Sequence, residues 1–144
     1  VFRYAQYIID GTNHWLTGYC DWNIVLDSIG GPNHVNNFAG AQVMVDYQND
    51  VIYYTPYYYV LKQFSRSMRP GDVALQVDYP ATMKTGADCE TQDIFLCAVE
   101  KTDGSYAINI LNMGSETTLP VQLGNHYANV KLPAASVQTI IVKL

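Results

Sequence analysis

The side chains best suited to chemistry in this sequence lie in one stretch, residues 21–38, which reads DWNIVLDSIGGPNHVNNF. Trp22 carries an indole with an apolar face and one N–H donor. Asn37 carries a carboxamide, which both donates and accepts hydrogen bonds and so matches a hydroxyl group. Judged by residue type alone, a structural role is the simpler interpretation of each: Trp22 as an aromatic residue of the core, and Asn37 as a residue that forms a turn.

Glutamates that could form a catalytic pair are few in this sequence. The glutamates are Glu90, Glu100 and Glu116, all in the second half of the chain. We interpret all three as solvated strand and turn residues.

The cysteines Cys20, Cys89 and Cys97 do not make a disulfide framework. Cys97 lies in the apolar run DIFLCAV and is expected to pack as a small hydrophobic residue. If Cys89 and this run form one extended strand, the two sulfurs are too far apart to bridge. No Cys-x-x-Cys pair and no His/Cys spacing predicts zinc, so we expect neither a metal nor a cofactor.

Composition narrows the class of protein. The chain has 144 residues, of which 49% are hydrophobic, which is typical of a globular protein with a real core. A net charge of −5 argues against a nucleic-acid partner, because phosphates need a basic surface. No apolar run reaches the roughly 18 residues of a membrane span. The opening VFRYAQYIIDG has no signal-peptide pattern and reads like the interior of a structure, so we expect the true N-terminus to lie elsewhere.

The elements that must position residues 21–38 are predicted from hydrophobic periodicity. Residues 3–15 show the spacing of one helix face, and residues 18–26 read as a strand that is apolar on both faces. Residues 41–47 are a second strand candidate. Thr55-Pro56 is typical of a helix start, and the apolar face that follows continues to residue 68.

After residue 72 the sequence is all-β. The runs VALQVD, DIFLCAVE, SYAINIL, TTLPVQL, YANVKL and SVQTIIVKL alternate with turn residues, and KTDG between the second and third predicts a hairpin. These runs indicate a small antiparallel β-sandwich. The helix, strand, loop and helix of the first half cannot close a domain alone, so they indicate the tail of a larger domain. A (β/α)8 barrel needs about 250 residues, so only its last unit or so would fit here.

Three segments carry a family resemblance. GYCDWNIVLDSIGGPNHVNNF resembles the last barrel strand and following loop of glycoside hydrolase family 30, which includes glucosylceramidases and β-glucanases. PYYYVLKQFSRSMRPGD resembles the last barrel helix of that family, and AVEKTDGSYAINILN resembles the hairpin of its β-domain. The resemblance implies that residues 1–68 are the last βα units of a catalytic (β/α)8 TIM barrel and that residues 69–144 are a C-terminal antiparallel β-sandwich domain.

The resemblance also implies a retaining mechanism with two glutamates at the ends of the fourth and seventh barrel strands. Both lie upstream of this chain, so we expect no catalytic residue in it. Because the mechanism then has its acid and base, His34 is interpreted as a loop contact.

The residues carried over from the family form part of a substrate pocket. Trp22 matches the tryptophan whose indole lies in the sugar pocket, and Asn37 matches the asparagine that reaches a sugar hydroxyl. Asp21 flanks Trp22, and Phe38 is expected at the pocket rim. Asp27 and Ser28 receive no role. The Gly30-Gly31-Pro32 sequence is expected to fold the loop back.

Three functions compete at this point. The first is the C-terminal part of an enzyme that hydrolyses β-glucosides such as glucosylceramide. The second is a relative acting on β-1,6-glucan, and the third is a non-catalytic β-sandwich binding module. The first implies the N-terminal portion of the same enzyme as a partner, association with a membrane surface through the lipid substrate, and a lysosomal or secreted location.

Overall fold

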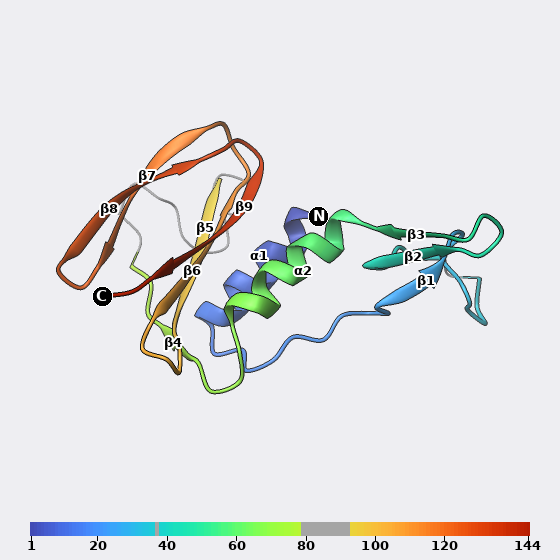
Figure 1. Ribbon diagram of the computed structural model, residues 1–144, viewed down its shortest axis with the longest axis horizontal. Coiled ribbons are helices and arrows are strands. Elements are labelled where there is room, and N and C mark those ends of the chain that lie inside the picture. The colour runs from blue at the N-terminus through green and yellow to red at the C-terminus, as the bar shows by residue number, and fades with distance from the viewer. Residues whose placement is uncertain (37, 79–92) are drawn as a thin grey trace.

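The computed structural model describes residues 1–36, 38–78 and 93–144. The molecule is elongated, with a small sheet at one end, two helices in the middle and a β-sandwich at the other end (Figure 1). None of the described helices has the length and apolar content needed to cross a membrane.

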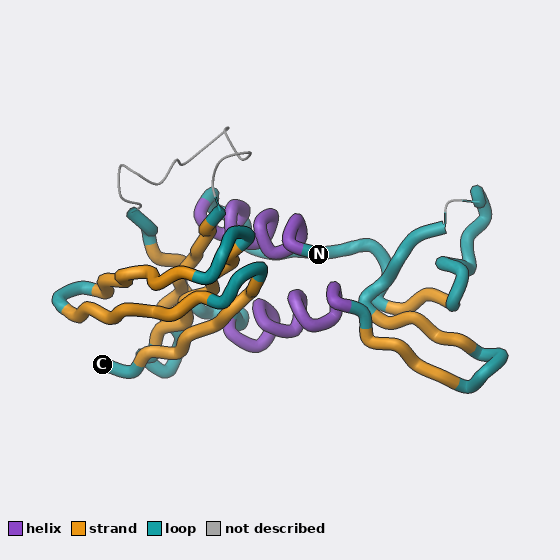
Figure 2. The backbone as a smooth tube through the Cα atoms, turned by 90° about the horizontal axis from the view of Figure 1, so that it is seen from above, coloured by secondary structure: helices purple, strands orange, loops and turns teal. Residues whose placement is uncertain are grey.

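The two helices lie close to their predicted positions. Helix α1 spans Phe2–Asn13 and helix α2 spans Pro56–Ser67. They lie side by side and run in the same direction, toward the sandwich (Figures 1 and 2). On α2 the buried apolar residues Val60 and Phe64 lie on the predicted face. On α1 the predicted face is only partly correct: Ile8 is buried as expected, but Trp15, which was assigned to the same face, lies beyond the helix and is exposed.

The small sheet contains strands β1 (Val25–Asp27), β2 (Val43–Asp46) and β3 (Val51–Tyr54), in that order. Strand β1 is parallel to β2, and β3 is antiparallel to β2. Strand β3 was not predicted; it lies between the strand candidate over residues 41–47 and the predicted helix start at Thr55-Pro56.

The predicted strand over residues 18–26 is wrong for most of its length, since only Val25–Asp27 is a strand. The physical reason is local. Asn23 has a φ of 37°, a left-handed conformation that asparagine tolerates and that interrupts an extended chain. The expected burial on both faces is also absent in this chain, where Ile24 is 73% exposed.

Within the described residues 73–78 and 93–144, the β-sandwich has six strands, as predicted. A four-stranded sheet has the order β4-β5-β6-β9, and β7 pairs with β8 in a second sheet. The strands are β4 (Val73–Leu75), β5 (Ile94–Glu100), β6 (Tyr106–Asn112), β7 (Thr117–Leu123), β8 (His126–Leu132) and β9 (Ser136–Val142). The predicted KTDG hairpin joins β5 to β6, with Gly104 at a φ of 80°.

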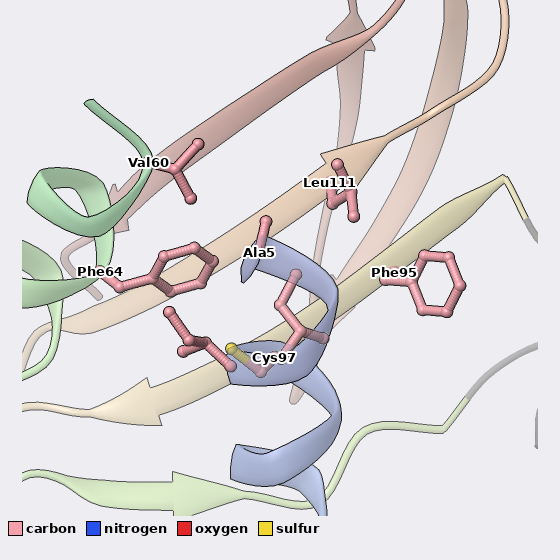
Figure 3. Close-up of a cluster of buried hydrophobic side chains, with 8 residues drawn as sticks. Ala5, Val60, Phe64, Phe95, Cys97 and Leu111 are labelled. Atoms are coloured by element: carbon pink, nitrogen blue, oxygen red, sulfur yellow. The ribbon is translucent and has the colours of Figure 1, made fainter. Parts of the chain in front are cut away.

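The four-stranded sheet has one core on each face, because successive side chains of a strand point to opposite sides. Ala98, Ile108 and Ile110 pack with Leu119 and Leu132 of the β7–β8 sheet. The other face packs against the helices in a cluster that we call the shared core (Figure 3). The shared core consists of Ala5, Ile8, Ile9, Val60, Phe64, Phe95, Cys97 and Leu111.

Cys97 is fully buried in the shared core and its thiol is free, as expected of a small hydrophobic residue. The partner considered for it, Cys89, lies outside the described residues. Because the helices and the sheet share this core, they form one packed body rather than two parts joined by a linker.

Candidate functional site

The site begins at a kink in the segment Asp21-Trp22-Asn23, immediately before β1. Asp21 Oδ1 accepts a hydrogen bond of 2.9 Å from the backbone N–H of Trp22, and Asn23 then turns the chain through its left-handed φ. The kink leaves the Trp22 side chain 71% exposed, so Trp22 is not a core residue of this chain. Irregular backbone of this kind often aims a side chain at a functional site.

The second carboxylate oxygen of Asp21 connects this kink to the start of β2. Gln42 Nε2 donates a hydrogen bond of 2.8 Å to Asp21 Oδ2. The Gln42 side chain is buried, with 5% of its surface exposed. The bond therefore fixes an exposed segment to a buried residue 21 positions later in the chain.

The charge of Asp21 acts on two nearby tyrosines. Burial, and then the negative charge of Asp21, raise the pKa of the Tyr4 and Tyr19 phenols above the ordinary tyrosine value. The ring of Tyr4 also meets that of Tyr57, with 4.8 Å between the centroids. Both phenols thus remain neutral donors at acidic and neutral pH.

The loop after β1, residues 28–39, is called the site loop. Asp27 holds its first turn, since Asp27 Oδ1 accepts from the backbone N–H of Ile29 at 3.0 Å and of Gly31 at 2.7 Å. Gly30 has a φ of 85°, and a Cβ there would lie 2.5 Å from the carbonyl oxygen of Ala39. The end of the site loop therefore packs directly against its beginning.

Asp27 is the residue that the sequence interpretation missed. It received no role, yet its side chain organises the turn. The signal was available, because an aspartate a few residues before Gly-Gly is typical of a side chain that caps a turn.

The remaining predicted residues lie on the site loop. Phe38 is 58% exposed beside the closure at Ala39, and His34 is exposed. Asn37 lies outside the described residues. The structure thus joins Asp21 and Trp22 by a direct contact and places Phe38 on the neighbouring segment.

Other reactive groups in the described part of the chain lie elsewhere. Glu100 and Glu116 are exposed in the β-sandwich, where Glu116 pairs with Lys131 at 3.1 Å. Glu90 lies outside the described residues. No group of three or more His, Cys, Asp or Glu residues that could hold a metal ion occurs within 1–36, 38–78 and 93–144.

Comparison with known protein families gives two adjacent matches. Residues 1–68 match the glycosyl hydrolase family 30 TIM-barrel domain, and residues 83–140 match the β-sandwich domain of the same family. The kink, β1 and the site loop all fall within the barrel match.

Relatives with similar sequences carry glucosylceramidase names. The chain is 34% identical over 116 residues to the lysosomal acid glucosylceramidase of Mus musculus, covering 79% of this chain and 20% of that protein. It is 31% identical over 147 residues to putative glucosylceramidase 1 of Caenorhabditis elegans, covering 96% of this chain and 26% of that protein. The chain thus spans about a quarter or less of the length of these relatives.

Solved structures agree on the fold. The crystal structure of SrfJ from Salmonella typhimurium matches with a TM-score of 0.84 and 26% identity, over 99% of this chain and 30% of that one. The endo-β1,6-glucanase BT3312 matches with a TM-score of 0.74 and 24% identity, over 91% of this chain and 28% of that one. The chain therefore belongs to glycosyl hydrolase family 30, of which it carries the end of the TIM barrel and the β-sandwich domain.

Proposed function

We propose that this chain is the C-terminal part of a retaining β-glycosidase and forms one wall of its sugar pocket. The observation that carries the proposal is the exposed indole of Trp22, presented by the kink before β1. In (β/α)8 barrels the active site lies at the carboxyl ends of the strands and in the loops that follow them, which supports a role for the site loop after β1.

Each predicted residue has a role in this pocket. The Trp22 indole offers its apolar face to sugar C–H groups and its N–H to an oxygen. Asn37 binds a sugar hydroxyl through its carboxamide, and Phe38 closes the rim. Asp21 holds the backbone of Trp22 through its N–H. The two catalytic glutamates belong to the upstream part of the protein, separated by roughly 5 Å in a retaining enzyme.

The substrate class that we favour is a β-glucoside, with glucosylceramide as the example that the names of the relatives suggest. A β-1,6-glucan is the alternative, although likeness to the β1,6-glucanase at 24% identity supports the fold alone. A non-catalytic β-sandwich module is disfavoured, because the chain also matches the barrel domain.

The proposal includes partners and a location. The upstream portion of the same enzyme completes the barrel around the small sheet. A glycolipid substrate brings the enzyme to a membrane surface. A lysosomal location follows the name of the mouse relative, with secretion as the alternative.

The test compares the two tryptophans in the complete enzyme. Trp22→Ala removes a pocket wall and an N–H donor, so kcat/KM on a β-glucoside should fall by the equivalent of roughly 2–4 kcal/mol. Trp15→Ala is the matched control, because Trp15 is 93% exposed and lies outside the proposed pocket. A mechanism-based sugar inhibitor should still label Trp22→Ala, since the nucleophile lies on another strand. Wild-type kcat/KM and labelling rate in Trp22→Ala would contradict the proposal.

Asn37→Ala is expected to have a smaller effect than Trp22→Ala. It removes hydrogen bonds to one hydroxyl, which is worth about 1–2 kcal/mol in transition-state stabilisation. Measuring kcat/KM on the β-glucoside and on its deoxy analogues would identify the hydroxyl. On the analogue that lacks this hydroxyl, the wild type and Asn37→Ala should have the same kcat/KM.

A further inference from the structure

We propose that Gln42 is a positioning residue for Trp22 and acts through Asp21. This inference rests on the proposed function of Trp22 and adds a residue outside the stretch 21–38. The link has two hydrogen bonds, from Gln42 Nε2 to Asp21 Oδ2 at 2.8 Å and from Trp22 N to Asp21 Oδ1 at 2.9 Å. Each carboxylate oxygen of Asp21 thus accepts from one of the two residues.

The burial of Gln42 shows that its side chain is dedicated to this contact. Gln42 Oε1 is buried and has no hydrogen-bond partner among the described residues. A buried acceptor without a partner costs free energy, whereas an apolar side chain of the same size would not. The hydrogen bond from Gln42 Nε2 to the Asp21 carboxylate is the favourable interaction that offsets this cost.

The backbone of Gln42 is fixed independently of its side chain. Thr55, at the start of α2, donates its backbone N–H to the Gln42 carbonyl oxygen at 3.0 Å. Its hydroxyl oxygen lies 2.9 Å from the Ala41 carbonyl oxygen and 3.1 Å from that of Gln42, so the one hydroxyl proton is shared between them. The packed helix α2 therefore holds the backbone of residue 42 in place. From this fixed backbone, the Gln42 side chain reaches Asp21 in the exposed kink. Because the backbone bonds remain when the side chain changes, the role of the side chain can be tested without dismantling the fold.

The position of Gln42 also links the two segments of the proposed pocket. It lies three residues after Ala39, where the site loop closes on Gly30, and it reaches back to the kink that presents Trp22. One side chain thus sets the position of the indole relative to the loop that carries Phe38. Small misplacements of a substrate-binding group have large effects on rate, so loss of this contact should lower the rate of hydrolysis.

The first experiment uses the complete enzyme and the substitution Gln42→Met. Methionine keeps the length of the side chain but cannot donate to Asp21. We expect kcat/KM on a β-glucoside to fall about fivefold to fiftyfold, the scale of one coupled polar contact. Gln48→Met is the control, because Gln48 is exposed on the turn after β2. It should keep the wild-type kcat/KM.

A double-mutant cycle separates positioning from general destabilisation. In a Trp22→Ala background, Gln42→Met should cause no further loss, because its effect passes through the missing indole. Losses that multiply would overturn the proposal, as would equal kcat/KM for Gln42→Met and Gln48→Met.

The substitution Gln42→Glu supplies a pH readout. Two facing carboxylates repel each other when both are ionised, but share a hydrogen bond when one is protonated. The phenols of Tyr4 and Tyr19 are the other titratable groups whose pKa values respond to Asp21, and because both pKa values are raised, these phenols stay neutral at acidic pH. The kcat/KM of Gln42→Glu relative to the wild type should therefore rise as pH falls. A ratio independent of pH would count against the contact.

A readout without catalysis keeps this inference separate from the proposed function. Protein labelled with 5-fluorotryptophan gives a ¹⁹F resonance for Trp22, identified by its absence in Trp22→Phe. The resonance should shift or broaden in Gln42→Met and stay unchanged in Gln48→Met. If the wild type hydrolyses no β-glucoside, the proposed function fails while this test still decides the role of Gln42. An unchanged Trp22 resonance in Gln42→Met would overturn that role.

Discussion

Burial raises the pKa of the Cys97 thiol to about 12, despite hydrogen bonds with the Thr12 and Asn109 side chains that favour the thiolate. The folded protein therefore keeps the thiol protonated at a pH where the unfolded chain loses the proton. The stabilising effect is complete below about pH 9 and disappears as the pH rises toward 12.

Comparison with Cys97→Ala measures this effect, since alanine has no proton to lose. Above about pH 9, the unfolding free energy of the wild type should fall relative to the variant by roughly 1.4 kcal/mol per pH unit. Thermal unfolding of the complete protein from pH 8 to 11 would show it as a converging pair of curves. Parallel curves would mean that the thiol is accessible to solvent.

At the scale of elements, the site loop depends on Gly30. Gly30→Ala combines an unfavourable positive φ with a clash against the backbone of Ala39. Gly104→Ala shares the positive φ but has nothing within 4 Å of the added Cβ. We expect Gly104→Ala to cost about 1 kcal/mol of stability and leave activity unchanged. Gly30→Ala should lower kcat/KM roughly tenfold to a hundredfold by displacing the loop. Equal kinetics for the two variants would show that loop closure is not needed.

The junction between α2 and the sandwich depends on Asp72. Its carboxylate accepts from the backbone N–H groups of Arg69 at 2.8 Å and Thr102 at 3.1 Å, and from Lys101 Nζ at 3.3 Å. Lys101 Nζ also donates to the Ser67 carbonyl in the last turn of α2, where a cation stabilises the helix end. Burial tends to raise the pKa of Asp72, but these hydrogen bonds outweigh it and lower the pKa below the ordinary aspartate value.

Asp72→Ala should therefore lower the unfolding free energy by roughly 2–4 kcal/mol, because three donors lose their acceptor. Asp78→Ala, which changes an exposed carboxylate, serves as the control. Since the folded pKa is lowered, the contribution of Asp72 is present above about pH 4 and is lost as the pH falls through the folded pKa. The gap in melting temperature between wild type and Asp72→Ala should narrow in acid, and a constant gap would contradict the assignment.

Elements with a clear period were predictable from the sequence. The apolar spacing around Ile8 and Phe64 located both helices, and Asp-Gly at 103–104 located the β5–β6 hairpin. Both signals are local and need no knowledge of distant contacts.

The site was harder to predict, for a physical reason. The left-handed Asn23 that breaks the strand is one of several conformations that asparagine allows, and its choice depends on the surroundings of Trp22. The contact between Asp21 and Gln42 joins residues whose proximity follows from the pairing of β1 with β2, which no period reveals. The family resemblance supplied Trp22, but nothing in the sequence alone indicated Gln42.

At the scale of the whole molecule, the two ends differ in how much of their apolar side-chain surface is buried. The shared core packs the helices on the sandwich, whereas every residue of β3 is exposed and Trp22, Ile24 and Ile52 are more than half exposed. An apolar surface of this kind is expected to be covered in the complete barrel.

Hydrogen exchange should reveal that difference. In the isolated 144-residue chain, amides of β5, β6 and β9 should exchange slowly while those of residues 16–54 exchange fast. In the complete protein, residues 16–54 should become protected. We also expect the isolated chain to aggregate through its uncovered end. A single sharp melt with uniform protection of the isolated chain would show that its small sheet needs no cover.

The position of α2 has a consequence for how this architecture can change. Helix α2 follows β3 directly and ends just before the first strand of the sandwich, so its 12 residues, roughly 18 Å, connect the small sheet to the sandwich. Lengthening α2 by one turn would shift the small sheet relative to the sandwich and would move Val60 or Phe64 out of the shared core. Insertions and deletions among homologues should accordingly gather in the site loop and the β2–β3 turn, and α2 should keep its length.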